Sequence, residues 1–126
     1  MNNNDKIAVF PGSFDPFTKG HEAIVHKSLN IFGKVIIAIG VNTKKSALFD
    51  LDKRISHINS LFDSNDSIEV KTFNSLTVDF CKLSGASHII RGLRNSIDFE
   101  YEKSIAHMNI DLAGIETIFF LTDQKY

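Results

Sequence analysis

Short apolar runs alternate along this chain with longer segments in which apolar residues recur every three or four positions. The runs are rich in Ile, Val and Phe, and they are mostly continuous rather than interrupted by polar residues. This pattern is typical of strands that are covered on both faces. The sequence therefore predicts strands at residues 7–10, 35–41, 68–73, 88–90 and 117–121.

The segments between these runs have the period of amphipathic helices. Their apolar stripes are Ile24, Val25, Leu29 and Phe32, then Leu51, Ile55, Ile58 and Phe62, and finally Tyr101, Ile105, Met108 and Leu112. A shorter helix is predicted for residues 76–83, because Gly85 is a suitable helix stop. This alternation favours a Rossmann-like, doubly wound α/β fold, in which a five-stranded parallel sheet carries helices on both faces.

Length and composition narrow the class of protein. The 126 residues predict a single domain, and 43% hydrophobic with 23% charged residues is typical of a soluble globular protein. A net charge of -1 excludes a global field that would attract nucleic acid or an acidic membrane. Because Cys81 is the single cysteine, an internal disulfide is excluded. Residues 1–6 lack the apolar core of a signal peptide, and the longest apolar run, residues 35–41, is too short to cross a bilayer. We expect a cytoplasmic protein that binds neither nucleic acid nor membrane.

Unusual residues follow the predicted strands, where parallel α/β sheets bind their ligands. In residues 12–21 a turn containing glycine and proline leads into a helix whose first turn contains His21. Glycine lets a backbone approach a ligand, the N–H groups of a helix start attract anions, and His21 adds a directional donor. The sequence contains neither the dinucleotide fingerprint G-x-G-x-x-G nor a P-loop. The simpler interpretation, that His21 only starts a helix and the glycines only form turns, stays open at this point.

Cations follow two other strands. Lys44 and Lys45 come after the second predicted strand, and Arg91 and Arg94 flank Gly92 after the fourth. The arginine fork suits phosphate oxygens, and lysine serves as a mobile point charge. Solvated surface charges are the alternative, which is weaker for the arginines because a strand end is where this fold places its site.

Carboxylates cluster at residues 98–102. Asp98 and Glu102 share one face of a helix, whereas Glu100 points elsewhere. Because acidic residues at a helix N-terminus also complement the helix dipole, Asp98 and Glu100 need no further role, and Glu102 is the better functional candidate. The sequence has no zinc-like Cys/His spacing and no evident Ser-His-Asp arrangement. The other histidines are interpreted as structural or solvent-facing: His26, His57, His88 and His107.

Two long motifs emerge when these stretches are combined. The first, FPGSFDPFTKGH, resembles the strand-loop-helix signature P-G-T/S-F-D-P-x-T-x-G-H of the phosphopantetheine adenylyltransferases, which belong to the nucleotidyltransferases with an HxGH-type motif. Here Thr18 takes the place of the first histidine. The second, IIRGLRNSIDFEYE followed by AHMN, resembles their other signature, and the order and separation of the two motifs also fit. The similarity extends over residues 6–126.

This resemblance implies transfer of AMP from ATP to 4'-phosphopantetheine, with magnesium present, to give pyrophosphate and dephospho-coenzyme A in the biosynthesis of coenzyme A. It also implies a homo-oligomer, because family members assemble as hexamers. The nucleophile is a phosphate that is already anionic, so the reaction needs positioning and charge relief rather than a general base.

The resemblance also implies a role for each matching residue, and it implies no metal ligand. His21, Lys44 and Arg91 are expected to be catalytic: His21 at the α-phosphate, Lys44 at the attacking phosphate with Lys45 as the fallback, and Arg91 at the phosphopantetheine. The expected ATP-binding residues are Ser13, Phe14, His21, Gly92, Leu93, Arg94 and Glu102. The expected phosphopantetheine-binding residues are Ser13, Lys44, Thr77, Arg91 and Asn109.

The chain departs from the family pattern at two places. Ser13 stands where threonine is commoner, and it keeps the hydroxyl. The sequence ends at residues 123–126, where the resemblance predicts an ATP-binding segment containing I-S-S and further helices, so we expect residues 1–126 to form one nucleotidyltransferase domain without them. Two alternatives remain: a nucleotidyltransferase that uses nicotinate mononucleotide or glycerol phosphate, against which RGLRNSIDFEYE weighs, and a non-catalytic binder of ATP, phosphopantetheine or coenzyme A.

Overall fold

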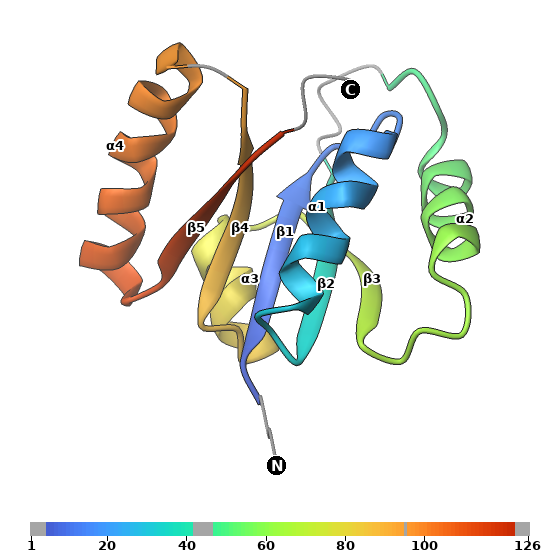
Figure 1. Cartoon of the computed structure of the whole chain (residues 1–126), viewed down its shortest axis with the longest axis horizontal. Helices are drawn as coiled ribbons and strands as arrows, with labels where there is room; N and C mark the ends of the chain where they lie inside the picture. Colours follow the sequence, from blue (N-terminus) through green and yellow to red (C-terminus); the bar gives the residue numbers. More distant parts are fainter. Residues whose placement is uncertain (1–4, 42–46, 95, 123–126) are drawn as a thin grey trace.

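The computed structural model describes residues 5–41, 47–94 and 96–122, in which strands and helices alternate strictly along the chain (Figure 1). The strands are β1 (Ile7–Gly12), β2 (Lys34–Gly40), β3 (Ile68–Phe73), β4 (His88–Leu93) and β5 (Glu116–Leu121). The helices are α1 (Lys19–Leu29), α2 (Leu51–Leu61), α3 (Thr77–Ser84) and α4 (Ser96–Ala113). None of the helices in these described ranges is both long and apolar enough to span a membrane.

The strands form a parallel sheet in the order β3-β2-β1-β4-β5. The chain starts at the centre of the sheet, adds β2 and β3 on one side, and then crosses over to add β4 and β5 on the other. The predicted doubly wound α/β class is therefore confirmed. Because the winding direction reverses between β1 and β4, the connections that leave these two strands diverge, and a crevice is left at their carboxyl ends.

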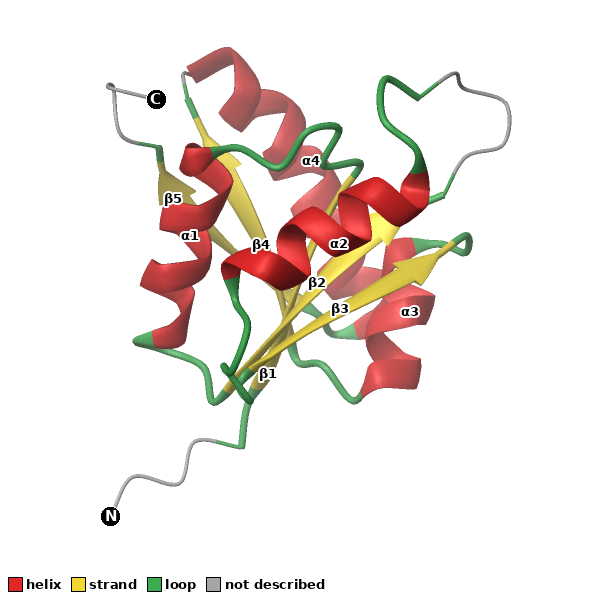
Figure 2. Ribbon diagram, turned by 90° about the vertical axis from the view of Figure 1, so that its right-hand side faces the viewer, coloured by secondary structure: helices red, strands yellow, loops and turns green. Residues whose placement is uncertain are grey.

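Helices on both faces explain why the strand sequences are continuously apolar (Figure 2). On one face Phe10 of β1 packs in the same buried cluster as Ile24 of α1. On the other face the neighbouring strand residue, Val9, packs in a second cluster with Val78 and Cys81 of α3. Successive strand residues therefore enter opposite halves of the core, as the two-residue period of a strand requires.

The apolar stripes predicted for α1 and α2 face the core. Their buried members are Ile24, Val25 and Phe32 in and after α1, and Ile58 and Phe62 in and after α2. The predicted stop of α3 is also confirmed. Gly85 follows the helix in the left-handed conformation, with φ of 73°, and its N–H donates to the carbonyl of Lys82 at 3.2 Å.

The apolar stripe predicted for α4 does not face the sheet. Its residues are largely exposed, with accessible fractions of 69% for Tyr101, 37% for Ile105, 56% for Met108 and 67% for Leu112. The less exposed side of the helix carries Glu102, Ala106, Asn109 and Ala113. Periodicity identifies the apolar side of a helix but not what covers it, and here the ion pair between Glu102 and Arg91 of β4 turns a polar side toward the sheet.

Strands β1 and β4 extend further than the sequence pattern predicts. β1 continues through Pro11 and Gly12, which pair with β2, and β4 continues through Arg91, Gly92 and Leu93, which pair with β5. The expectation that Gly12 and residues 91–93 come after their strands is therefore wrong. The consequence matters for function, because a rigid sheet rather than a loop positions the Arg91 side chain.

Candidate functional site

A cavity of about 800 Å³ opens where the carboxyl ends of β1 and β4 meet the start of α1. These ends lie at one edge of the sheet in Figure 1. The cavity walls come from residues 10–16, from residues 18–21 with Ile24, and from Arg91, Gly92, Arg94 and Thr122. Its position is the reversal point of the strand order, which is where open α/β sheets bind ligands. Its volume lies within the range of small-molecule and cofactor sites.

The first turn of α1 fixes the orientation of His21. Thr18 is the N-cap residue, and its side chain accepts from the backbone N–H of His21 at 3.3 Å. In return the backbone N–H of Thr18 donates to Nδ1 of His21 at 2.9 Å. A histidine thus takes the place that Glu or Gln usually has in such a capping box. Because Nδ1 accepts this bond, the proton of the neutral ring is on Nε2, which is the donor left for a ligand.

Aromatic rings surround His21. The ring centroids of Phe14, Phe17 and Phe10 lie 5.1, 5.3 and 6.0 Å from that of the imidazole. Burial among these rings lowers the pKa of His21 below its ordinary 6.5, and the positive charge of Arg91 lowers it further. His21 is therefore a neutral hydrogen-bond donor at pH 7 rather than a cation.

Arg91 is fixed in place before any ligand arrives. Its Nε and Nη2 donate to the two carboxylate oxygens of Glu102, each at 2.9 Å, and its Nη1 donates to the carbonyl of Pro11 at 3.1 Å. These bonds use three of the five guanidinium N–H groups and leave two for a ligand. The Glu102 side chain is only 13% exposed, and the two-pronged pair holds the guanidinium plane between β1 and α4.

Arg94 has more freedom than Arg91. Its Nε lies 3.3 Å from Oδ2 of Asp98, and 76% of its side chain is exposed. An exposed pair of this kind contributes little to stability, so the guanidinium can exchange the carboxylate for an anionic ligand at small cost.

Two glycines of the site have a packing role that the sequence analysis did not predict. A Cβ on Gly92 would lie 2.6 Å from Cδ1 of Ile24, so the missing side chain lets β4 pack against α1. A Cβ on Gly12 would lie 2.9 Å from Cζ of Phe14, so that glycine makes room for the ring beside His21. Both glycines therefore shape the cavity, because they let the lining residues Phe14 and Ile24 pack closely against its wall.

The structure brings together part of the predicted site. The predicted residues on the cavity wall are Ser13, Phe14, His21, Arg91, Gly92 and Arg94. Four others lie off this wall: Leu93 is buried, Thr77 begins α3 at the carboxyl end of β3, Glu102 binds Arg91, and Asn109 lies further along α4. Lys44 and its fallback Lys45 lie outside the described residues.

Sequence reasoning assigned no role to two residues that the structure places at the site. Thr18 orients His21, and the pattern Thr-x-x-His at a helix start was the signal that could have shown it. Thr122 lines the cavity after β5 and donates from Oγ1 to the carbonyl of Leu93 at 3.1 Å. No sequence signal marked Thr122, because its role depends on β5 lying next to β4.

The arrangement suits an anion that carries phosphate groups. Arg91 and Arg94 offer N–H donors at the cavity wall, and His21 offers a neutral donor at the same wall. In the part of the chain that the structure describes, no three His, Cys, Asp or Glu side chains lie close enough to hold a metal ion. The site can therefore place and stabilise phosphoryl oxygens.

Comparisons with known proteins agree with this description. Residues 9–126 match a family model described as Cytidylyltransferase-like. The phosphopantetheine adenylyltransferase of Cytophaga hutchinsonii is 57% identical over 118 residues, which cover 93% of this chain and 79% of that protein. The enzyme of the same name from Flavobacterium psychrophilum is 51% identical over 115 residues, which cover 91% of this chain and 76% of that protein.

A solved structure shares the fold at low sequence identity. It is a bifunctional NMN adenylyltransferase/ADP ribose pyrophosphatase from Francisella tularensis, complexed with AMP and a manganese ion. Its TM-score is 0.67 at 21% identity, and the match covers 94% of this chain and 38% of that chain. At this identity the likeness shows the architecture alone.

Proposed function

The chain belongs to the cytidylyltransferase-like family and, within it, to the phosphopantetheine adenylyltransferases, and we propose that it transfers AMP from ATP to 4'-phosphopantetheine in coenzyme A biosynthesis. The observation that carries this proposal is the pairing of a neutral His21 donor with a pre-positioned Arg91 across one cavity at the reversal point of the sheet. The names of the relatives describe a transferase, so the alternative of a non-catalytic binder is not favoured.

In the proposed reaction an oxygen of the phosphopantetheine phosphate attacks the α-phosphorus of ATP. The bond from that phosphorus to the oxygen that bridges the α- and β-phosphates breaks, and pyrophosphate leaves with this oxygen and the electron pair. The nucleophile is already anionic at neutral pH, so the reaction needs no proton acceptor. What the protein supplies is alignment of the two phosphates and donors aimed at the oxygens on which negative charge collects.

His21 and Arg91 divide this work. The Nε2–H of His21 donates to an α-phosphate oxygen, and the bond strengthens as charge develops there. Arg91 uses its two remaining N–H groups on the phosphate of phosphopantetheine and holds it in line with the α-phosphorus. The two donors belong to different elements of the cavity wall, Arg91 to β4 and His21 to α1, so each can meet a different phosphate.

The other predicted roles remain part of the proposal. Ser13, Phe14, Gly92, Leu93, Arg94 and Glu102 are assigned to ATP, with Ser13 also near the acceptor phosphate. Lys44, Thr77 and Asn109 are assigned to phosphopantetheine. Position on the cavity wall supports the roles of Ser13, Phe14, Gly92 and Arg94. The ion pair with Arg91 gives Glu102 a second role, as a positioning residue for that arginine.

Magnesium is proposed to arrive with ATP. The described residues contain no group of three or more His, Cys, Asp or Glu side chains that could hold a metal ion. Phosphate oxygens and water are ligands that magnesium prefers, and a nucleotide triphosphate supplies them. No step of the proposed reaction is assigned to the ion.

An assembly of several copies is also part of the proposal. The exposed stripe of α4, made of Tyr101, Ile105, Met108 and Leu112, supports it, because an apolar helix face of this kind marks an interaction surface. Light scattering on purified protein measures the mass directly, and a monomeric mass at all concentrations would exclude the assembly. The cytoplasmic location stays a prediction.

Pyrophosphate release tests the proposed function. The protein is incubated with ATP and magnesium, alone and with 4'-phosphopantetheine, nicotinate mononucleotide or glycerol phosphate in parallel. Release that depends on 4'-phosphopantetheine is the expected result. Release that depends instead on one of the other two acceptors would assign the chain to a different reaction, and binding of ATP without release under any condition would favour a binding protein.

A further inference from the structure

The loop that leaves β1 contains a strained residue next to the cavity. Phe14 has φ of 48°, in the left-handed region that residues with a side chain rarely adopt. A bulky residue persists in this region only when its surroundings hold it there, and such strain gathers at functional sites. Phe14 lies on the cavity wall and packs against His21, so whatever holds this loop also shapes the proposed phosphate site.

Asp15, the next residue, is one of the groups that hold the loop. Its two carboxylate oxygens accept from the backbone N–H groups of Leu48 and Phe49, at 2.6 and 2.7 Å. Hydrogen bonds to an ionised carboxylate are short and about twice as strong as those between neutral groups. Asp15 therefore joins the β1 loop to the segment that leads into α2.

Arg54 of α2 holds the same two segments from the other side. Its Nη1 donates to the carbonyl of Ser13 at 2.9 Å, and its Nε donates to the carbonyl of Phe49 at 3.1 Å. Within the described residues, no ion pair links Arg54 to Asp15 or to any other carboxylate. The Asp15 carboxylate and the Arg54 guanidinium instead form hydrogen bonds with backbone N–H and carbonyl groups. This arrangement is expected of side chains that fix the position of a backbone.

From these four hydrogen bonds we propose that Asp15 and Arg54 form a clasp that positions the Ser13–Phe14 peptide for phosphate binding. The peptide is trans, so its carbonyl and its N–H point in opposite directions. The Ser13 carbonyl accepts from Arg54, which is not among the residues that line the cavity at the strand ends. The Phe14 N–H therefore faces away from Arg54, toward that cavity, which Ser13 and Phe14 line. Among the described residues this N–H has no hydrogen-bond partner, so it is available to a phosphate oxygen.

The clasp deepens the proposed function and rests on it for the identity of the phosphate ligand. Asp15 and Arg54 act through the backbone and touch no reacting atom, so they are positioning residues. Two predictions distinguish this role from general stabilisation of the fold. Loss of the clasp weakens the contact between Phe14 N–H and the nucleotide, and it lowers turnover with ATP while the KM for phosphopantetheine, whose phosphate Arg91 holds, stays unchanged.

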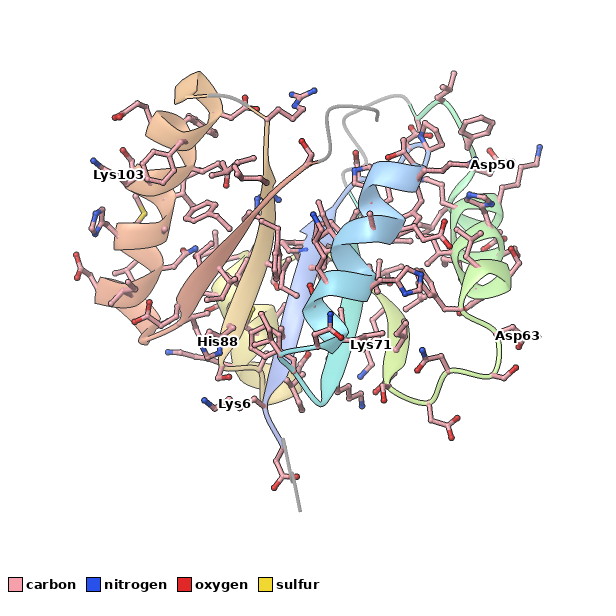
Figure 3. All side chains as sticks on the ribbon, in the orientation of Figure 1. Lys6, Asp50, Asp63, Lys71, His88 and Lys103 are labelled. Atoms are coloured by element: carbon pink, nitrogen blue, oxygen red, sulfur yellow. The ribbon has the colours of Figure 1, made fainter. Side chains whose placement is uncertain are left out.

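The test combines amide chemical shifts with kinetics on the full chain. Nitrogen-labelled protein is titrated with magnesium and α,β-methylene-ATP, which cannot transfer its adenylyl group. The test variants are Asp15→Asn, which presents an amide N–H to one of the two backbone donors, and Arg54→Lys and Arg54→Met. The matched controls are Asp63→Asn and Lys53→Met. Asp63 lies at the opposite end of α2 from Asp50 (Figure 3), and therefore away from the segment that Asp15 and Arg54 hold. Lys53 neighbours Arg54 in sequence and makes no hydrogen bond or ion pair with the described residues.

In the parent protein the Phe14 amide shift should be among the largest on saturation with the analogue. In Asp15→Asn and Arg54→Met this shift should fall to less than about half, and kcat should fall on the order of tenfold or more. The KM for phosphopantetheine should stay within about twofold, and both controls should match the parent. Arg54→Lys should lie between, because one ammonium group cannot reproduce the two bonds of the guanidinium fork.

Each outcome decides a separate point. A parent Phe14 amide that does not move with the analogue, or clasp variants that keep the parent shift and turnover, would overturn the clasp. If Arg54→Met fails to fold, its amide spectrum will lose dispersion, and Asp15→Asn and Arg54→Lys then decide the question alone. A clasp-dependent Phe14 shift in a protein that forms no dephospho-coenzyme A would instead contradict the proposed function and leave the clasp standing.

Discussion

Replacing His21 by alanine removes the neutral side-chain donor that the first turn of α1 brings to the cavity wall. Thr18 holds Nδ1 as an acceptor, so Nε2–H is the group lost, and three phenylalanine rings pack around the imidazole and partly bury it. Loss of a donor that meets developing charge in a desolvated site costs about a hundredfold to a thousandfold in turnover. We expect a fall of that size in kcat for His21→Ala.

Binding of ATP in the ground state should change much less. An ordinary hydrogen bond contributes about 0.5–1.5 kcal/mol, so the KM for ATP should rise by about tenfold at most. The split arises because the bond between Nε2–H and the α-phosphate grows stronger as the transition state forms. His21→Gln, which keeps an amide donor and more of the ring's volume, should retain a larger share of the turnover than His21→Ala.

The assay is steady-state pyrophosphate release with both substrates varied, supported by thermal unfolding of each variant. His26→Ala is the matched control, since His26 lies on the same helix and its imidazole is 60% exposed beside Glu22. The control should behave as the parent does. Turnover of His21→Ala within about threefold of the parent, in a folded protein, would refute the role of His21.

Three further predictions test other parts of the site. Arg91→Ala should raise the KM for phosphopantetheine more than the KM for ATP, and the reverse pattern in the same steady-state assay would contradict the division of roles. The pKa of His21 lies below 6.5, mainly because the ring is buried and also because the positive charge of Arg91 is near it. The neutral ring, and the folding stability linked to it, should therefore persist above pH 6.5 and be lost only as the pH falls below that value. In a plot of kcat/KM against pH, the acidic limb should therefore lie below pH 6.5, and a limb above pH 6.5 in the parent would contradict the lowered pKa of His21. Thr18→Val, which removes the hydroxyl partner of the ring, should change the pH at which this limb occurs. Gly92→Ala should destabilise the protein by about 1–3 kcal/mol in denaturant unfolding, because the new methyl group meets Ile24 at 2.6 Å; an unchanged midpoint would show that the helix yields freely.

The central strands and two of the helix stripes could be predicted from sequence because their signals are local and redundant. β1 and β2 are buried on both faces, so an unbroken apolar run is enough to locate them. The orientation of α4 could not be predicted in this way. Its apolar residues recur with helical period, but Glu102 turns toward the sheet to meet Arg91, and that pairing depends on two elements separated in sequence.

The same distinction, between local signals and pairings of residues distant in sequence, applies to the candidate site. Ser13, Arg91 and Arg94 could be named because they lie at or near the carboxyl ends of strands, and His21 because it starts the helix after β1; the fold brings these positions together. The roles of Thr18, Asp15 and Arg54 depend on which backbone groups they meet, and a residue type alone does not reveal its hydrogen-bond partner. Lys44 remains a prediction from sequence, because it lies outside the described residues.

Transfer of label from the α-phosphorus of ATP tests the central claim most directly. The protein is mixed with ATP labelled at that phosphorus, magnesium and 4'-phosphopantetheine, and the products are separated and counted. The account predicts label in dephospho-coenzyme A, in an amount equal to the pyrophosphate released, and no labelled product when 4'-phosphopantetheine is left out. Label that appears only in free AMP, or that stays in ATP while 4'-phosphopantetheine is bound, would contradict it.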